Sequence, residues 1–384
     1  MQPSNRIYLD HAATTPVHPD AAEAMRPYLT EIYGNPSSLH SFGQDAKRAL
    51  DAARDLIADS IGASPAEIYF TSSGTESDNL AMIGVSSAMA SRGNHIITSS
   101  IEHHAVLETC GYLSTKGFDI TYLPVDEYGI VGPKSVRDAI TDNTVLVSIM
   151  HANNEIGTIE PISEIAAITR ERGIAFHTDA VQTVGHIPVD VDALGIDLLS
   201  MSAHKYYGPK GVGALYVRKG TRIAPLIHGG SQERNRRAGT ENIPGIIGMA
   251  KALEISIAGM STTTANEIKL RDYLIDGLSR AIPDVQFNGH PHLHLSNNIN
   301  ISVPSVEGES MLLMLDMKGI AASSGSACSS GALEPSHVLK ALGLPFEMAQ
   351  GTLRFSIGHG NTEAEIDFTI ESLEAIVDRL RSMA

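Results

Sequence analysis

Short apolar runs rich in β-branched residues alternate with longer stretches in which apolar residues recur at helical spacing. The short runs predict strands over residues 67–71, 94–99, 118–123, 144–149, 174–178, 196–201 and 213–217. Helical patterns lie between them, for example over residues 44–60 and 161–172. This alternation is typical of an α/β protein with a mostly parallel sheet.

The pattern changes after roughly residue 257. There we predict a long helix over about 263–281, a strand at 297–303, a helix near 308–317, a strand at 352–357 and a final helix at 362–382. A smaller α+β domain is therefore expected to follow the larger α/β domain.

The composition is that of an ordinary globular enzyme. Of the 384 residues, 44 are acidic and 28 are basic, which gives a formal net charge of −16. An acidic surface repels phosphate backbones, so nucleic acid is not expected as a general ligand. We found neither an apolar run long enough to span a bilayer nor the apolar core of a signal peptide, so we expect a cytoplasmic protein without membrane association.

The chain has two cysteines, which are too few for a disulfide framework. Cys110 lies in an apolar helical run and is predicted to belong to the core. Cys328 lies among glycine, serine and alanine in residues 323–335, the composition of an exposed loop. Because exposed free thiols are generally avoided unless they are used, Cys328 is a candidate reactive thiol.

Polar residues follow the predicted strands at the sheet edge where ligands gather in α/β proteins. Gly74 and Thr75 lie in a small-residue loop after strand 67–71 that could offer backbone N–H groups to a phosphate, although such loops equally serve as plain N-caps. Asp179 directly follows strand 174–178. A protonated pyridine nitrogen would be a suitable partner for a buried acid, but Asp179 alone fits a helix N-cap better.

Further polar residues lie at the same edge. His103 and His104 follow strand 94–99 without metal-ligand spacing, so no metal site is predicted. Asn154 lies in a polar turn that could orient a ring hydroxyl. Lys205 lies between the apolar strand 196–201 and a Gly/Pro turn, where desolvation favours Schiff-base formation. Asp179 and the phosphate-type loop are expected at the same sheet edge as Lys205. Their presence there favours a cofactor-binding role for Lys205 over that of an ordinary surface lysine.

With these motifs the sequence resembles the cysteine desulfurases, in particular the longer-loop NifS/IscS-like group of the class-V aminotransferase family. The match follows nearly the whole chain in order, and the cysteine loop together with the HK pair is its most specific part. The matching segments are YLDHAATTP near the start, GNPSSLH at 34–40, TSSGTESDN at 71–79, EHHAV at 102–106, NNEIG at 153–157, TDAVQ at 178–182, SAHKYYGPKG at 202–211, GGSQERNRRAGTEN at 229–242, SGSACSSGALEPSHVLKALG at 324–343 and LRFSIG at 353–358.

The resemblance implies a pyridoxal 5'-phosphate enzyme of fold type I, the aspartate-aminotransferase-like fold. It implies a homodimer with its sites at the subunit boundary. The large cofactor-binding domain would cover residues 15–257, and residues 1–14 would join residues 258–384 in the small domain that carries the catalytic cysteine. The reaction implied converts L-cysteine to L-alanine and moves the sulfur to Cys328 as a persulfide.

The resemblance also implies roles for individual residues. Lys205 would hold the cofactor as a Schiff base, Cys328 would take the sulfur, and His103 would serve proton traffic at the substrate sulfur. The other implied contacts are Asp179, Asn154, Gln182 and His103 for the cofactor ring; Gly74, Thr75, Ser202, His204 and the partner-contributed Thr240 for the phosphate; and Arg354 with Asn35 nearby for the substrate carboxylate.

Several alternatives stay open. A selenocysteine or cysteine lyase on the same fold would not depend on Cys328. The sulfur could go to tRNA thiolation instead of iron–sulfur cluster assembly, and in either case a sulfur-acceptor protein, such as a cluster scaffold, is expected. A sulfur carrier with a decayed cofactor site is disfavoured by the intact Lys205, Asp179 and His103.

Two features of the match bear on partners. Some members continue past the last helix with a tail that engages the scaffold, whereas this sequence ends at Ala384, so docking by that route is not expected. The basic residues Arg234, Arg236 and Arg237 lie in a motif near the dimer boundary. We therefore expect them at the subunit interface or the rim of the site.

Overall fold

The structure, a computed structural model, describes residues 6–324 and 335–383 of the chain. A large seven-stranded sheet has the order β2-β8-β7-β6-β5-β3-β4. In this sheet β8 is antiparallel to both of its neighbours, and the other pairs are parallel. All seven predicted strands are confirmed, with the bounds β2 Ile68–Thr71, β3 His95–Ser99, β4 Asp119–Leu123, β5 Thr144–Ser148, β6 Ala175–Asp179, β7 Leu198–Ser202 and β8 Gly213–Val217.

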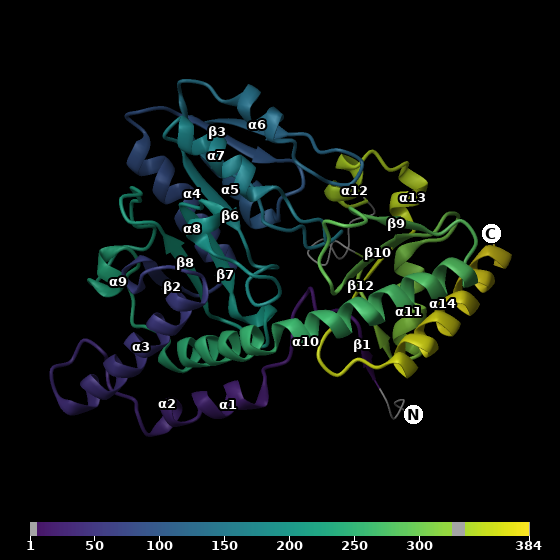
Figure 1. Cartoon of the computed structure of the whole chain (residues 1–384), viewed down its shortest axis with the longest axis horizontal. Coiled ribbons are helices and arrows are strands. Elements are labelled where there is room, and N and C mark those ends of the chain that lie inside the picture. The colour runs from purple at the N-terminus through teal and green to yellow at the C-terminus, as the bar shows by residue number, and fades with distance from the viewer. Residues whose placement is uncertain (1–5, 325–334, 384) are drawn as a thin grey trace.

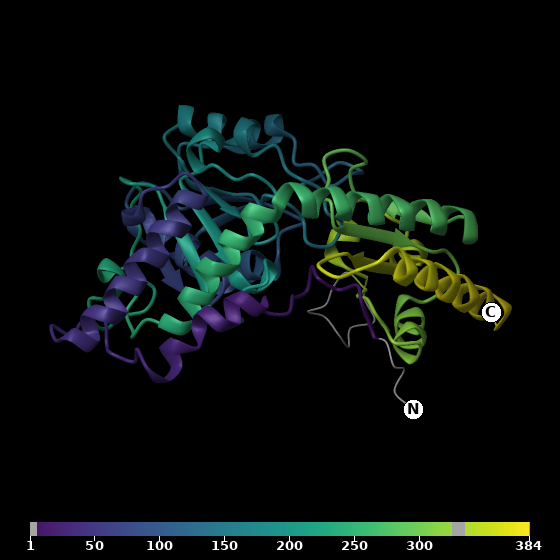
Figure 2. The same cartoon turned by 60° about the horizontal axis from the view of Figure 1, so that its bottom comes forward.

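Successive residues of a strand point to opposite sides of a sheet. Because successive residues of these strands are apolar, both faces of the sheet are apolar. In β7, Leu198 packs in one hydrophobic cluster and Leu199 in another, and Ile96 and Ile97 of β3 divide in the same way. Helices pack around the sheet (Figures 1 and 2). They include α3 Ser41–Ser60, α4 Gly74–Met89, α5 His104–Ser114, α6 Pro133–Ala139, α7 Ile162–Glu171 and α8 Val191–Leu194.

A second, smaller part of the molecule lies beside the large sheet and its helices (Figure 1). Its antiparallel sheet has the order β12-β10-β9, and β1 pairs with β11 in parallel. Ile7 and Leu9, near the N-terminus, pack in the same hydrophobic cluster as Leu274 and Ile366. The elements are β1 Ile7–Tyr8, β9 Gln286–Asn288, β10 Asn298–Ser302, α11 Gly308–Met317, β11 Ile320–Ala321, β12 Thr352–Ser356 and α14 Glu363–Met383.

The long helix α10, Ile243–Ala281, joins the two parts. Its predicted start near residue 263 was wrong: the helix begins at Ile243, in a stretch whose three glycines and one proline weaken the local helix preference. The side chain of Asn242 caps the helix by accepting a hydrogen bond from Gly245 N. Packing against α1 and α3 stabilises the first half, and packing against α14 stabilises the second.

Helix α10 is also the helix, among the described residues, that is long and apolar enough to cross a membrane by length and composition alone. Its contacts with both parts of the protein account for this apolar character. The remaining elements are short: α1 Pro19–Met25, α2 Pro27–Thr30, η1 Pro65–Glu67, η2 Ala203–Lys205, α9 Gln232–Asn235, α12 His337–Ala341 and α13 Phe346–Gln350.

Candidate active site

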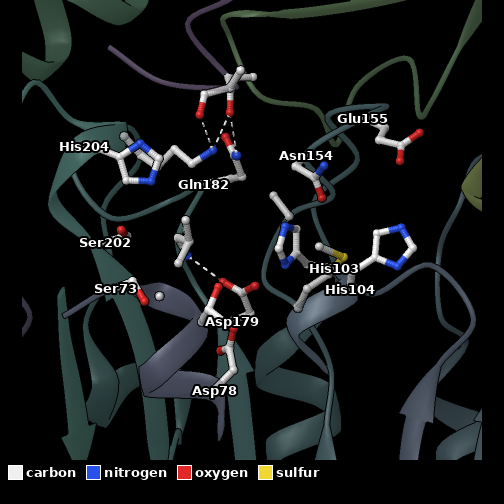
Figure 3. A pocket seen from close by; sticks show the side chains of 18 of the residues that line it. Ser73, Asp78, His103, His104, Asn154, Glu155, Asp179, Gln182, Ser202 and His204 are labelled. Carbon is white, nitrogen blue, oxygen red and sulfur yellow. Dashed lines mark hydrogen bonds between the residues drawn. The ribbon is translucent and has the colours of Figure 1, made fainter. Parts of the chain in front are cut away.

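A cavity of about 260 Å³ lies at the carboxyl ends of β2, β6 and β7 (Figure 3). Its wall combines residues from distant parts of the sequence, from Ala12 near the N-terminus to Arg354 on β12. Most residues singled out from the sequence meet here, namely Gly74, Thr75, His103, Asn154, Asp179, Gln182, Ser202, His204, Lys205 and Arg354. The predicted convergence at one sheet edge is therefore present in the fold.

The start of α4 forms one corner of the cavity. Ser73 caps this helix by accepting a hydrogen bond from Glu76 N at 3.1 Å. A Cβ atom on Gly74 would lie 2.7 Å from Val181 Cγ2 and 3.4 Å from Ser202 Cβ, so a side chain there would fill the corner. The buried Ser202 hydroxyl has no hydrogen-bond partner among the described residues. A helix N-terminus with spare backbone N–H groups and an unused hydroxyl suits a phosphate group.

Lys205 reaches the cavity from η2, directly after β7. Its Nζ donates hydrogen bonds to Ala12 O at 2.6 Å and Ala13 O at 3.0 Å. Gln182 Nε2 also donates to Ala12 O, at 3.1 Å. Residues 12 and 13 therefore hold the lysine at the cavity. Strand-end reasoning could not anticipate this contact, because residues 12 and 13 do not follow a strand of the large sheet.

Asp179 lies at the floor of the cavity and is 6% exposed. Its Oδ1 accepts a hydrogen bond from Val181 N at 2.9 Å, as expected for a cap. Burial raises the pKa of Asp179, while the neighbouring His103, the hydrogen bond from Val181 N and the positive charge of Lys205 act in the opposite direction. A cationic partner in the cavity would therefore favour the ionised form.

Asp78 is a second buried acid that the sequence analysis did not single out. It lines the cavity below Asp179, as Figure 3 shows, and burial together with the Asp179 charge raises its pKa well above the usual range. Residues four apart share one face of a helix, so the position of Asp78 relative to Gly74 was a usable signal. Two neighbouring buried carboxyls resist simultaneous ionisation.

His103 is the N-cap of α5. Its Nδ1 accepts a hydrogen bond from Ala105 N at 3.0 Å, so the neutral ring carries its proton on Nε2. Burial lowers the pKa of His103, and the Asp179 charge opposes this shift. His103 therefore presents a neutral Nε2–H group as a donor.

Arg354 is the largest fully buried side chain at the site, at 2% exposed. Its Nη2 pairs with Asp10 Oδ1 at 2.8 Å and its Nη1 donates to Asn154 O at 2.9 Å. Its Nε has no partner among the described residues. Asp10 was not predicted as a site residue, although it lies in the matching segment YLDHAATTP, and it holds the guanidinium in place.

His204 Nδ1 lies 3.1 Å from Thr14 Oγ1, another contact with the N-terminal segment. Asn35 and Thr240 are exposed and do not line the cavity of this chain. Asn35 Oδ1 instead accepts a hydrogen bond from Ser37 N. Cys328 lies outside the described residues. Among those residues, no cluster of three or more His, Cys, Asp or Glu side chains is arranged to hold a metal ion.

Comparison with known proteins identifies the family. Residues 7–368 match the Aminotransferase class-V family. The chain is 57% identical to a cysteine desulfurase IscS from Dictyoglomus turgidum over 98% of this chain and 96% of the relative. It is 56% identical to a cysteine desulfurase IscS from Methanosarcina thermophila over 98% of this chain and 93% of the relative.

Solved structures agree with this assignment. A NifS-like protein superposes with a TM-score of 0.92 at 41% identity, covering 98% of this chain and 100% of the other. A cysteine desulfurase from Thermococcus onnurineus gives a TM-score of 0.87 at 29% identity, covering 97% and 95%. These similarities confirm the family and the fold type I architecture expected from the motifs. The chain belongs to the class-V aminotransferase family and, within it, to the cysteine desulfurases.

Proposed function

We propose that this chain converts L-cysteine to L-alanine and takes the sulfur onto Cys328 as a persulfide. One sulfur atom moves from the substrate to the enzyme thiol, and the proton of that thiol balances the new C–H bond of alanine. The observation that carries the proposal is the convergence of Lys205, Asp179 and the α4 N-terminus in one cavity. Alanine release from L-cysteine by the purified protein, with reductant present, tests it.

The cavity suits pyridoxal phosphate, the cofactor of this family. The Ser202 hydroxyl, which has no hydrogen-bond partner in the described part of the chain, and the space beside Gly74 match a phosphate. Buried Asp179 matches a protonated ring nitrogen. When bound, the cofactor supplies an electron-withdrawing ring that stabilises negative charge on the substrate Cα. The residues that would hold it are Gly74, Thr75, His103, Asn154, Asp179, Gln182, Ser202, His204 and Lys205, with Thr240 supplied by a second subunit.

The side chains around the cavity would have different roles in the reaction. With the cofactor bound, the amine of Lys205 would move the Cα proton of the substrate, and Asp179 would keep the ring nitrogen protonated. Arg354 would bind the substrate carboxylate through the guanidinium edge that contains Nε, which has no partner among residues 6–324 and 335–383. His103 would contact the ring, and its Nε2–H group would be available to the substrate sulfur, because Nδ1 is occupied by Ala105 N.

Arg237 is expected to support phosphate binding indirectly. Its Nε pairs with Glu76 Oε1 at 2.8 Å, in the first turn of α4. Burial alone would raise the pKa of Glu76, but hydrogen bonds from Arg237 and Ser72 outweigh it and lower the pKa. Arg237→Ala leaves this carboxylate charge uncompensated beside the phosphate corner. We therefore expect roughly 5-fold weaker affinity for pyridoxal phosphate, measured by absorbance titration of the cofactor-free protein.

Arg236→Ala is the matched control, because Arg236 donates to the Ile223 carbonyl and not to Glu76. Equal cofactor affinity in the Arg237→Ala and wild-type proteins would contradict the charge argument. Arg234 likewise donates to carbonyl groups of residues 65, 66 and 68 of its own chain. All three arginines therefore have partners within the chain.

We also propose that the protein acts as a homodimer. Large apolar side chains are exposed from α2 to the first turn of α3, namely Leu29, Tyr33, Leu39 and Phe42. The rings of Tyr33 and Phe42 lie 5.7 Å apart, and Leu39 is 93% exposed. Several large apolar side chains exposed close together in one segment favour a protein–protein interface there. Asn35, in the same segment, and Thr240 are both exposed, as required of residues that serve the site of a second subunit.

Charges on this apolar surface are expected to separate the subunits. The double substitution Leu39→Asp with Phe42→Asp should convert the dimer to a monomer in light scattering coupled to size-exclusion chromatography. Cofactor affinity should fall with it, because Thr240 of a partner would be lost. Leu313→Asp is the control, since Leu313 is 62% exposed on α11, away from this surface. A double variant that stays dimeric would place the interface elsewhere.

The finer assignments concern the destination of the sulfur. The IscS names of the relatives support delivery to an acceptor protein for iron–sulfur cluster assembly. The acidic net charge of −16 favours a protein acceptor over tRNA itself. We propose the cytoplasm as the compartment, where reducing conditions preserve a reactive thiol.

A further inference from the structure

One side of the cavity is lined by polar side chains that have no role in the proposed reaction. They are His104, Glu155 and His337. His104 is the first residue of α5 and His337 the first residue of α12, and their ring centroids lie 4.9 Å apart. Figure 3 shows His104 and Glu155 on the side of His103 that faces away from His204.

Most of the hydrogen-bonding groups on this side are already in use. Glu155, which is 3% exposed, accepts a hydrogen bond from Ser336 Oγ at 2.6 Å. His337 Nε2 lies 3.0 Å from Glu102 O, and a carbonyl can only accept, so Nε2 carries the ring proton. Burial lowers the pKa of His337, which keeps its ring neutral. His337 is therefore a fixed, uncharged neighbour of His104.

The ring of His104 differs from these groups. It makes no hydrogen bond to any residue that the structure describes, whereas Nδ1 of His103 is occupied by Ala105 N. A neutral imidazole has one unprotonated nitrogen that can accept a hydrogen bond. Of the two adjacent histidines, His104 is therefore the one with acceptor capacity left for a ligand.

The substrate has a matching group. The Cα of L-cysteine bears an amine, a carboxylate and the CH₂SH group. In the proposed function the amine is directed toward the cofactor on Lys205 and the carboxylate toward Arg354. The thiol then faces the remaining polar side of the cavity, which contains His103 and His104. Nε2–H of His103 is a donor, so the S–H group needs a different partner as acceptor.

We propose that His104 is a specificity-determining residue that recognises the sulfur end of the substrate, by accepting a hydrogen bond from the thiol of L-cysteine. His337 packs against the His104 ring and holds it in place. The inference rests on the proposed function, because that function directs the amine and carboxylate of the substrate. It involves no bond cleavage and no redox step, so it can be measured as binding.

The experiment compares two ligands that differ by the sulfur atom. In a Cys328→Ala holoenzyme, sulfur transfer is blocked, and the absorbance of the cofactor reports equilibrium binding of L-cysteine or L-alanine. Adding His104→Ala is expected to weaken L-cysteine binding roughly 3- to 10-fold, the effect of one hydrogen bond. L-Alanine binding should stay unchanged. His104→Asn should recover most of the L-cysteine affinity, because its amide oxygen can accept from the thiol.

His292→Ala is the matched control, since this histidine is exposed and does not line the cavity. An equal loss for both ligands would show that His104 only supports the structure, and no loss for either would place the sulfur elsewhere. Either result overturns the inference. Failure of the proposed function itself appears separately, as alanine formation that persists in the Cys328→Ala protein with His104 intact.

Discussion

Replacing Cys328 by alanine is expected to lower alanine formation from L-cysteine by a factor on the order of 10³ or more. The thiol is the proposed acceptor of the sulfur, and the sequence has one further cysteine, Cys110, which is buried in the core. Cofactor binding should be retained, because the residues proposed to hold the ring and the phosphate are unchanged. Alanine released per bound cofactor is the measurement.

Cys110→Ala provides the matched control, since Cys110 is the other cysteine of the chain. Cys110 is fully buried in the core on α5, as predicted, and burial raises the pKa of its thiol to about 12. It is therefore almost entirely protonated at neutral pH and unreactive. Its removal should leave turnover intact and cost about 1 kcal/mol of stability through a small cavity. A Cys328→Ala protein as active as the wild type would instead identify a lyase.

Replacing Lys205 by alanine is expected to end covalent attachment of the cofactor. Borohydride reduction followed by mass spectrometry should find the cofactor on Lys205 in the wild-type protein and on no residue of the variant. Turnover should fall by a factor on the order of 10³ or more, because the same amine is proposed to move the Cα proton. The contacts of Nζ with Ala12 O and Ala13 O would also be lost.

Lys210→Ala separates the role of this amine from a general effect of positive charge. Lys210 lies in the same segment after β7, but its Nζ donates to Thr15 O at 2.6 Å and it does not line the cavity. The Lys210→Ala protein should keep the reducible linkage and most of its activity. Cofactor trapped on the Lys205→Ala protein at another lysine would refute the assignment.

Local patterns predicted the large sheet well, because a strand buried on both faces must be a short, continuous apolar run. The same reasoning missed the first half of α10, where three glycines interrupt the helical pattern and packing against α1 and α3 stabilises the helix. The Asn242 cap marks the start of that helix, and tertiary contacts hold its first half in place.

The residues of the site likewise divide into those that the sequence predicted and those that it did not. Gly74, Asp179 and Lys205 were found because the carboxyl ends of neighbouring strands meet at one edge. Asp10 was not found, since it reaches Arg354 across nearly the whole length of the chain. Asp78 was missed although its position four residues after Gly74 on the same helix was a usable signal. Roles that need a second subunit, such as those of Asn35 and Thr240, remain predictions.

The sequence by itself established the fold class, the family and the residues that can do the chemistry, because these depend on periodicity and on short motifs that local order preserves. The tertiary structure established which atoms of the site can still bind a ligand. Nδ1 of His103 caps a helix, the His104 ring makes no hydrogen bond among the described residues, and Asp78 is buried beside Asp179. Such facts depend on hydrogen-bond geometry and desolvation between residues far apart in the chain, which no local pattern encodes.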